Sequence, residues 1–189
     1  MTPTKRPPDA TREAATQIEA ARERAAMAVH EAAHAVAAVL LGGHVELSVL
    51  DPEDRSDLKG LTTVAEDSLT ADAQAQIAWA GPYAEARFDA GRRPTWRGID
   101  AAMARSGHGD LAMITAAGGP VQADVGRVEK IVEDEWPAVL RLARRIARDG
   151  YGTHWHALAE LGFPAGDTGG PTSFTLSCIR AGMRPAPRR

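Results

Sequence analysis

The chain has 189 residues, of which 44% are hydrophobic and 25% charged, the composition of an ordinary globular protein. Its length favours a single domain with a sizeable core. A formal net charge of −3 gives no general attraction to nucleic acids or anionic membranes, so we expect neither as a partner. The single cysteine, Cys178, excludes a framework of internal disulfides and is typical of a reducing cytoplasm.

No stretch of the sequence reaches the ~20 consecutive apolar residues that a bilayer-spanning helix needs, and the N-terminus lacks the apolar segment of a signal peptide. The sequence also contains no glycine-rich phosphate loop followed by Lys and Ser or Thr. We therefore expect a cytoplasmic protein that binds neither a membrane nor ATP.

Composition divides the chain into three parts. Residues 1–10 contain Pro, Lys and Arg and are predicted to be disordered. Residues 11–163 are predicted to form one domain, and the Gly-, Pro- and Arg-rich residues 164–189 a partly mobile tail. Aromatic residues make up only 5% of the chain and alanine-rich stretches dominate, so closely packed helices are expected. With one pair of strands, this predicts a mainly α fold with a small β-hairpin.

The first helix is predicted from about Arg12 to the glycine pair Gly42-Gly43, which terminates helices well. Its first half carries most of its charged residues and should be solvated. Residues 25–41 contain no Pro or Gly, and their single charge is that of Glu31. This second half should therefore be buried.

The buried half contains the most informative motif of the sequence, His-Glu-Ala-Ala-His at residues 30–34. His30 and His34 stand one turn apart on the same helix face, where each can give one ring nitrogen to a single Zn²⁺ ion. Glu31 lies about 100° round the helix and can reach a water on that metal without being a strong ligand itself. This is the HExxH arrangement of zinc peptidases, in which the glutamate is the general base. The alternative is a surface helix whose histidines are solvated or bonded to core carbonyls.

A change of hydrophobic period follows the helix. Residues 45–50 alternate like a half-buried strand, residues 51–59 form a polar loop, and residues 60–64 can return as a second strand. A hairpin here would put a strand edge beside the zinc, where an extended peptide could pair with it. The alternative is a structural hairpin that only covers the helix.

A second helix is predicted from Thr70, a plausible N-cap, with a break or kink at Gly81-Pro82. Its candidate core positions are Ile77, Trp79, Ala80, Tyr83, Ala84 and Phe88. Residues 91–98 are predicted to be a basic loop, and residues 99–104 a short helix.

The remaining elements are helical. Gly107-His108-Gly109 is predicted to be a flexible approach to a helix over residues 110–117. Residues 121–149 are predicted to form a long amphipathic helical region bent at Trp136-Pro137. The last helix is expected over residues 153–161, with three side chains turned inward, those of Trp155, Leu158 and Leu161.

A catalytic zinc site needs a third protein ligand besides the two histidines. Asp110 is the first candidate, because it follows a glycine-containing turn and starts a helix, where a carboxylate is electrostatically favoured. Glu85 is the rival. Weaker candidates are His108, Asp100, His154 and His156. The alternative role for Asp110 is an ordinary helix N-cap, and for Glu85 a carboxylate paired with Arg87 or Arg92.

The run VHEAAHAV at residues 29–36 resembles the H-E-A-G-H-A segment of FtsH-type ATP-dependent zinc peptidases. The strand pair after it is similar to theirs, and AGPYAE at residues 80–85 is similar to their A-G-x-x-A-E helix. The sequence GHGDL at residues 107–111 looks like their G-x-x-x-D-[LI] turn, whose aspartate is the third zinc ligand. The resemblance spans about residues 27–160. It implies that Asp110 is the third ligand and that Glu85 lies beside the ligands.

The chain differs from that family in three ways. It has no ATPase domain and no transmembrane anchor, and Ala33 stands where the family usually has Gly. Without the ATPase motor of that family, we do not expect this protein to degrade folded proteins processively. The peptidase chemistry of the family does not need the motor and can still apply. FtsH-type peptidases assemble as rings, so the resemblance makes a homo-oligomer a candidate assembly for this protein.

Three interpretations follow. The first is a zinc-dependent endopeptidase that hydrolyses peptide bonds in flexible or unfolded polypeptides without ATP-driven unfolding, with Zn²⁺ on His30, His34 and Asp110 and Glu31 as general base. The second is a non-catalytic metal-binding scaffold or regulator that binds peptides or a protein partner, although a pure scaffold has no use for Glu31. The third is a helical structural protein with an accidental motif.

Overall fold

A computed structural model describes residues 10–50, 60–65 and 69–183 of the chain. This part is mainly helical with a small antiparallel sheet, which confirms the predicted fold class. Apart from Ala10, the predicted disordered N-terminus lies outside the described residues. The predicted polar loop over residues 51–59 and the end of the tail from residue 184 lie outside them as well.

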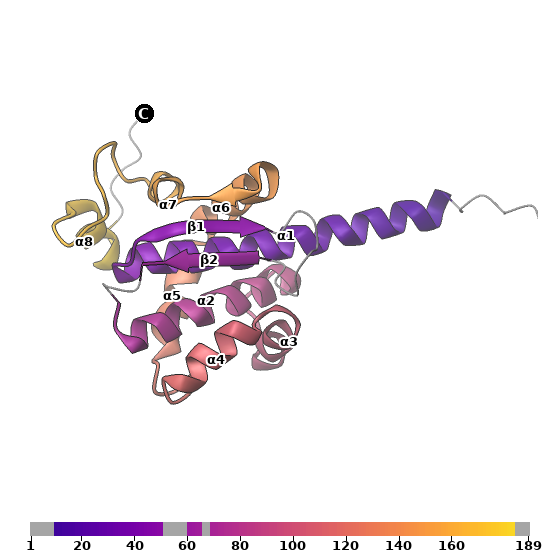
Figure 1. Cartoon of the computed structure of the whole chain (residues 1–189), viewed down its shortest axis with the longest axis horizontal. Coiled ribbons are helices and arrows are strands. Elements are labelled where there is room, and N and C mark those ends of the chain that lie inside the picture. The colour runs from indigo at the N-terminus through magenta and orange to yellow at the C-terminus, as the bar shows by residue number, and fades with distance from the viewer. Residues whose placement is uncertain (1–9, 51–59, 66–68, 184–189) are drawn as a thin grey trace, which may run out of the picture.

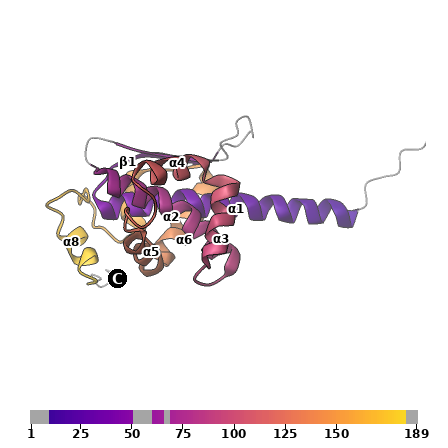
Figure 2. The ribbon, with the colours of Figure 1, turned by 90° about the horizontal axis from the view of Figure 1, so that it is seen from below.

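Helix α1 (Ala10–Leu41) is the axis of the fold (Figure 1). Its first half projects away from the rest of the protein, which both views show (Figures 1 and 2), and residues 12–24 are exposed. Residues 26–40 are buried, as the apolar pattern predicts. The helix ends where expected, because Gly42 adopts a left-handed backbone conformation with φ 95°.

By length and apolar composition α1 could also cross a membrane, but 78% of its most apolar 18-residue window is buried inside the protein. Burial of this kind is typical of the core helix of a soluble protein.

The sheet lies along α1 (Figure 1). The predicted strands are present as β1 (Val45–Leu50) and β2 (Gly60–Val64), which pair antiparallel. A two-residue strand, β3 (Tyr151–Gly152), pairs with the other side of β1 and gives the order β2-β1-β3. A strand this short has no sequence period and was not predicted. Strand β2 is therefore an edge strand among the described strands.

Helix α2 (Ala71–Ala90) packs against the buried half of α1. Its N-cap is Thr70, as predicted, and the Thr70 hydroxyl accepts a hydrogen bond from the backbone N–H of Ala73. Of the predicted break or kink at Gly81-Pro82, the break is wrong, because the helix continues through Pro82. Proline in a helix interior costs about 3 kcal/mol, and the burial of the whole segment 75–86 offsets that cost. The predicted core side chains of α2 are buried, except that Phe88 is partly buried.

Five further helices follow before the C-terminal segment: α3 (Trp96–Ser106), α4 (His108–Ala116), α5 (Val125–Asp134), α6 (Trp136–Asp149) and α7 (His154–Glu160). Helix α3 begins before the predicted 99–104 because the side chain of Thr95 caps it. Helix α4 already includes His108 and Gly109, so the predicted flexible approach to Asp110 is wrong. The predicted bend at Trp136-Pro137 separates α5 from α6.

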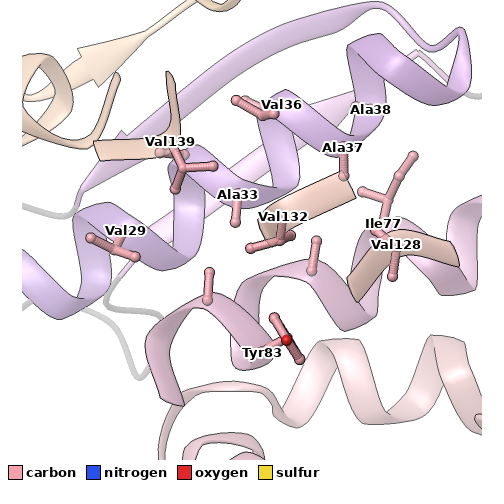
Figure 3. Close-up of a cluster of buried hydrophobic side chains, with 14 of the residues drawn as sticks. Val29, Ala33, Val36, Ala37, Ala38, Ile77, Tyr83, Val128, Val132 and Val139 are labelled. Atoms are coloured by element: carbon pink, nitrogen blue, oxygen red, sulfur yellow. The ribbon is translucent and has the colours of Figure 1, made fainter. Parts of the chain in front are cut away.

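The hydrophobic core lies where α1 meets α2, α5 and α6 (Figure 3). Valine and alanine side chains of α1, such as Val29, Ala33 and Val36, belong to one buried cluster with Tyr83 of α2 and Val132 of α5. Small side chains let the helices approach closely, as the alanine-rich composition predicts.

Helix α7 corrects one prediction. Leu158 and Leu161 are buried as expected, but the side chain of Trp155 is 55% exposed. His154 is buried in its place. Its Nδ1 accepts the backbone N–H of Val45 at 3.3 Å, and its Nε2 lies 3.0 Å from a backbone carbonyl oxygen.

Helix α7 is not the last helix, because α8 (Phe174–Arg180) forms within residues predicted as tail. Ser173 caps α8. At its other end the Arg180 Nε donates to the backbone carbonyl of Leu40 at 2.7 Å, in the last turn of α1. A cation is favourable at a helix C-terminus, so Arg180 both caps α1 and anchors α8.

Arg180→Ala should therefore lower the free energy of unfolding by about 1 kcal/mol, because the Leu40 carbonyl loses a charged donor. Urea denaturation measures this. Arg148→Ala is the matched control, since Arg148 is exposed and pairs with its sequence neighbour Asp149; its effect should stay within about 0.5 kcal/mol. Equal effects of the two substitutions would contradict the capping role.

Candidate metal centre

The structure brings His30, His34 and Asp110 together on the inner side of α1. The two histidines are 3% and 6% exposed, and their ring centroids lie 4.6 Å apart. Asp110 reaches both rings: Oδ2 lies 3.2 Å from Nε2 of His30, and Oδ1 lies 3.4 Å from Nε2 of His34. One ligand atom from each residue fits within 4.8 Å of the others. Among the described residues, this is the one such group of His, Cys, Asp or Glu.

Helix α4 delivers Asp110 from its first turn, 76 residues after His34 in the sequence. The side chain of Asp110 is 15% exposed. Burial by itself would raise the pKa of this carboxyl group. The positive charge of His34 and hydrogen bonds from both histidines outweigh burial, and they hold the pKa of Asp110 well below its ordinary value.

The pKa values of both histidines shift in the opposite direction. Burial by itself would lower the pKa of His30, but hydrogen bonds to Asp110 and Glu85 and the charge of Glu31 raise it to about 10. The pKa of His34 is also raised, because the charge of Asp110 outweighs the effect of burial. The three groups therefore attract a positive charge to the space between them. Protons supply that charge when no metal is bound, and a metal cation would replace them.

The other ring nitrogen of each histidine faces away from Asp110 and is held by an acceptor. Nδ1 of His30 lies 3.0 Å from Oε2 of Glu85, and Nδ1 of His34 lies 2.7 Å from the backbone oxygen of Ile77. Each Nδ1–H donates to its acceptor, so each Nε2 faces the cluster and could give its lone pair to a metal ion once its proton is lost. This is how histidine ligands are oriented in metal sites. Two imidazoles and one carboxylate also form a donor set that Zn²⁺ accepts, so the residues fit the ion.

Glu85 is fully enclosed on the far side of His30, with its side chain 2% exposed. Arg105 donates from Nε to Oε1 of Glu85 at 2.8 Å, and the Ser106 hydroxyl donates to Oε2. Hydrogen bonds from His30 and Ser106 outweigh burial and lower the pKa of Glu85. The alternative partners considered for Glu85 are wrong: Arg87 instead pairs with Glu133, at 2.9 Å.

A glycine allows α2 to approach the two histidines. A Cβ atom at Gly81 would overlap the Nε2 atoms of both His34 and His30. Any larger residue would therefore occupy the place where the ring nitrogens converge. The helix-weakening Gly81 of α2 is thus explained by the histidines that it faces.

Glu31 sits next to the cluster but is held by a different element. It is 3% exposed, and the Thr62 hydroxyl on β2 donates to its Oε2 at 2.6 Å. The hydroxyl of Ser48, on β1, lies 2.9 Å from the Thr62 hydroxyl and can donate to it. A Cβ at Gly60 would lie 2.5 Å from Oε1 of Glu31, so β2 can approach α1 this closely only with glycine there.

The cluster and Glu31 open into one pocket of about 500 Å³. Strand β2 and helix α4 line it, and helices α1 and α2 also contribute. Apolar side chains lie round the polar centre: Met27, Leu61, Val64, Leu69, Ile77 and Met113. A pocket of this size, apolar with a few convergent polar groups, is typical of a ligand site.

The structure does not bring the weaker ligand candidates into the cluster. His108 lines the pocket but is not part of the ligand group, and Asp100 is exposed on α3. His154 is bonded elsewhere, and His156 stacks near Tyr151 with its ring centroid 5.9 Å away. Sequence reasoning missed Thr62, Arg105 and Ser106, which carry no motif of their own and act through contacts distant in sequence.

Comparison with protein-family models gives no match to the chain, and comparison with curated proteins gives no significant match. Any function of the protein is therefore inferred from the site itself.

We expect purified protein to carry about one Zn²⁺ per chain, and His34→Ala and Asp110→Ala each to lose it. Glu85→Ala should keep it at micromolar protein concentration, because Glu85 touches a ligand and not the metal position. Elemental analysis after gel filtration measures the content. If Asp110→Ala retains its zinc, Asp110 is not the third ligand. If only Glu85→Ala loses its zinc, Glu85 is the third ligand instead.

Gly81→Ala should lose most of the zinc and lower the free energy of unfolding by about 1–3 kcal/mol, because the new methyl group overlaps the histidine rings. The matched control is Gly98→Ala in α3, where a Cβ would meet its nearest neighbour, the Thr95 hydroxyl, at an ordinary 3.6 Å. That variant should keep its zinc and unfold no more readily than wild type. Zinc content and urea denaturation measure both, and a fully loaded Gly81→Ala protein would contradict the close approach.

Proposed function

We propose that this protein is a zinc-dependent endopeptidase that cleaves flexible or unfolded polypeptides without ATP-driven unfolding. The observation that carries the proposal is the position of Glu31. Its carboxylate lines the same pocket as His30, His34 and Asp110, although none of the three is its hydrogen-bond partner. A metal site that served only to hold the fold together would not need a carboxylate there.

Three protein ligands and an open pocket also favour a catalytic over a structural ion, since structural zinc sites are usually closed by four protein ligands. The resemblance of residues 29–36, 80–85 and 107–111 to FtsH-type zinc peptidases supports the same chemistry. Each of these segments contributes a residue to the site: His30, Glu85 and Asp110.

When bound, Zn²⁺ supplies a Lewis acid that polarises a carbonyl group and makes water acidic enough to lose a proton near neutral pH. Glu31 is the base that takes this proton and later gives it to the leaving amine. Thr62 holds the carboxylate by Oε2, so the base is oriented before the substrate arrives. His30 and His34 are oriented through their Nδ1 atoms.

Strand β2 is the proposed substrate guide. It is an edge strand among the described strands, it lines the pocket, and Thr62 at its centre holds Glu31. An extended peptide could add to this edge through backbone hydrogen bonds, which make few demands on sequence. Most of the backbone of a folded protein is already paired, so flexible or unfolded segments are the proposed substrates.

The proposed setting is the cytoplasm. The only cysteine, Cys178, is buried and free, which suits a reducing compartment.

The test is proteolysis of casein, an unfolded substrate, by the zinc-loaded protein without ATP. Glu31→Gln should keep the zinc and lose at least about 100-fold in cleavage rate, because the amide cannot accept the proton. Glu46→Gln is the matched control, since Glu46 is an exposed glutamate on β1 outside the pocket. It should cleave at the wild-type rate.

Two results would contradict the proposal. Zinc-loaded wild type that cleaves no unfolded substrate would favour a non-catalytic metal-binding scaffold. Full cleavage by Glu31→Gln would remove Glu31 as the base.

A further inference from the structure

We propose that Arg105 and Ser106 are positioning residues of the metal centre, which act through Glu85 on His30 and fix the turn that delivers Asp110. The inference rests on the proposed metal site and identifies residues of α3 that neither the motif nor the ligand set contains. None of these residues touches the metal position itself.

The contacts form a continuous chain from α3 to the ligand. The Glu85 carboxylate accepts from Nδ1 of His30 at 3.0 Å and from the Ser106 hydroxyl through the same oxygen, Oε2. Its other oxygen, Oε1, accepts from the Arg105 guanidinium, with Nη2 at 2.6 Å. Nη2 also contacts Asp89 Oδ2 at 2.7 Å, and this second contact fixes the plane of the guanidinium.

The burial of Glu85 makes these contacts necessary. Its side chain is 2% exposed, and a buried carboxylate without compensation is strongly disfavoured. Arg105 supplies the charge and is 48% exposed, so it reaches from the protein surface into the pocket wall. Among the described contacts, Arg105 is the one permanently charged residue that donates to the Glu85 carboxylate, and removing Arg105 removes that donor. The hold of the carboxylate on the His30 ring should then weaken.

The same two residues lie at the corner that places the third ligand. Ser106 is the last residue of α3, Gly107 is the N-cap of α4, and Asp110 lies in the first turn of α4. Gly107 is buried, and a Cβ there would lie 3.0 Å from Pro82 Cγ, so the corner packs directly on α2. Glu85 therefore joins the helix that carries His30 to the corner that carries Asp110.

A purely structural role of Arg105 would have a different effect on zinc affinity from a positioning role. As a half-exposed ion pair, Arg105 would contribute little to stability and nothing to metal affinity. As a positioning residue it changes the zinc dissociation constant, and only while Glu85 keeps its carboxylate.

The experiment measures the zinc dissociation constant by chelator competition for wild type, Arg105→Gln, Ser106→Ala, Glu85→Gln and the double variant Arg105→Gln/Glu85→Gln. Removing partners of a metal-bound histidine typically costs about 10–100-fold in affinity. We expect Glu85→Gln to lower the zinc affinity by an amount in this range. Arg105→Gln and Ser106→Ala should each lower the affinity by roughly tenfold relative to wild type. Arg105→Gln should add little in the Glu85→Gln background.

The matched control is Arg93→Gln, because Arg93 also pairs with a glutamate, Glu129, at 3.2 Å but away from the pocket. It should bind zinc as wild type does. The absorption spectrum of the Co²⁺-substituted protein is a second readout, and the ligand-field bands of Arg105→Gln and Ser106→Ala should differ from those of wild type and Arg93→Gln.

Zinc affinities of Arg105→Gln and Ser106→Ala equal to wild type would overturn the inference and leave the proposed function intact. So would an Arg105→Gln effect that is undiminished in the Glu85→Gln background. If Arg105→Gln does not fold, Ser106→Ala decides, because it removes one hydroxyl and no charge. Wild type that binds no zinc would overturn both the proposed function and this inference.

Discussion

The fold depends on the burial of ionisable side chains within α1. His30, Glu31 and His34 lie in the most enclosed part of the longest helix, where an unpaired polar group is strongly disfavoured. Each is satisfied by a different neighbour: α2 supplies Glu85 and the Ile77 carbonyl, α4 supplies Asp110, and β2 supplies Thr62. The elements round α1 therefore take positions that satisfy its polar face, and the hydrophobic core forms on its other faces (Figure 3).

Features of the fold that depend on neighbours in sequence could be predicted, and features that depend on distant contacts could not. The Thr70 cap and the end of α1 at Gly42 are local signals and are confirmed. Pro82 is also a local signal, but packing against α1 outweighs it. Trp155 has a large apolar side chain and is therefore expected to turn inward. His154 occupies the inward position instead, because it can form hydrogen bonds with both Val45 and a loop carbonyl. Helix α8 depends on capping by Ser173 and docking by Arg180.

The candidate site divides in the same way. His30, Glu31 and His34 share one helix turn, so their spacing alone placed them together. The helix start favours Asp110 over Glu85, and the family resemblance decides between them, because both carboxylates are plausible from residue type. The structure brings both to His30, one at each ring nitrogen. Hydroxyl and guanidinium partners such as Thr62 and Arg105 have no fixed spacing from the motif, and only their positions in the fold reveal them.

The two sides of the cluster differ in a way that bears on its chemistry. On the Nδ1 side of the histidines the site is closed by Glu85 and by the Ile77 carbonyl, both of α2. On the Nε2 side it opens to the pocket, between β2 and α4. His30, His34 and Asp110 would hold a metal ion there, and the open pocket would leave room for water beside it. Glu31 lies on the open side, one residue from His30, so its carboxylate cannot move far relative to that histidine. In the proposed function, a peptide added to the edge of β2 would lie beside the pocket that Glu31 lines.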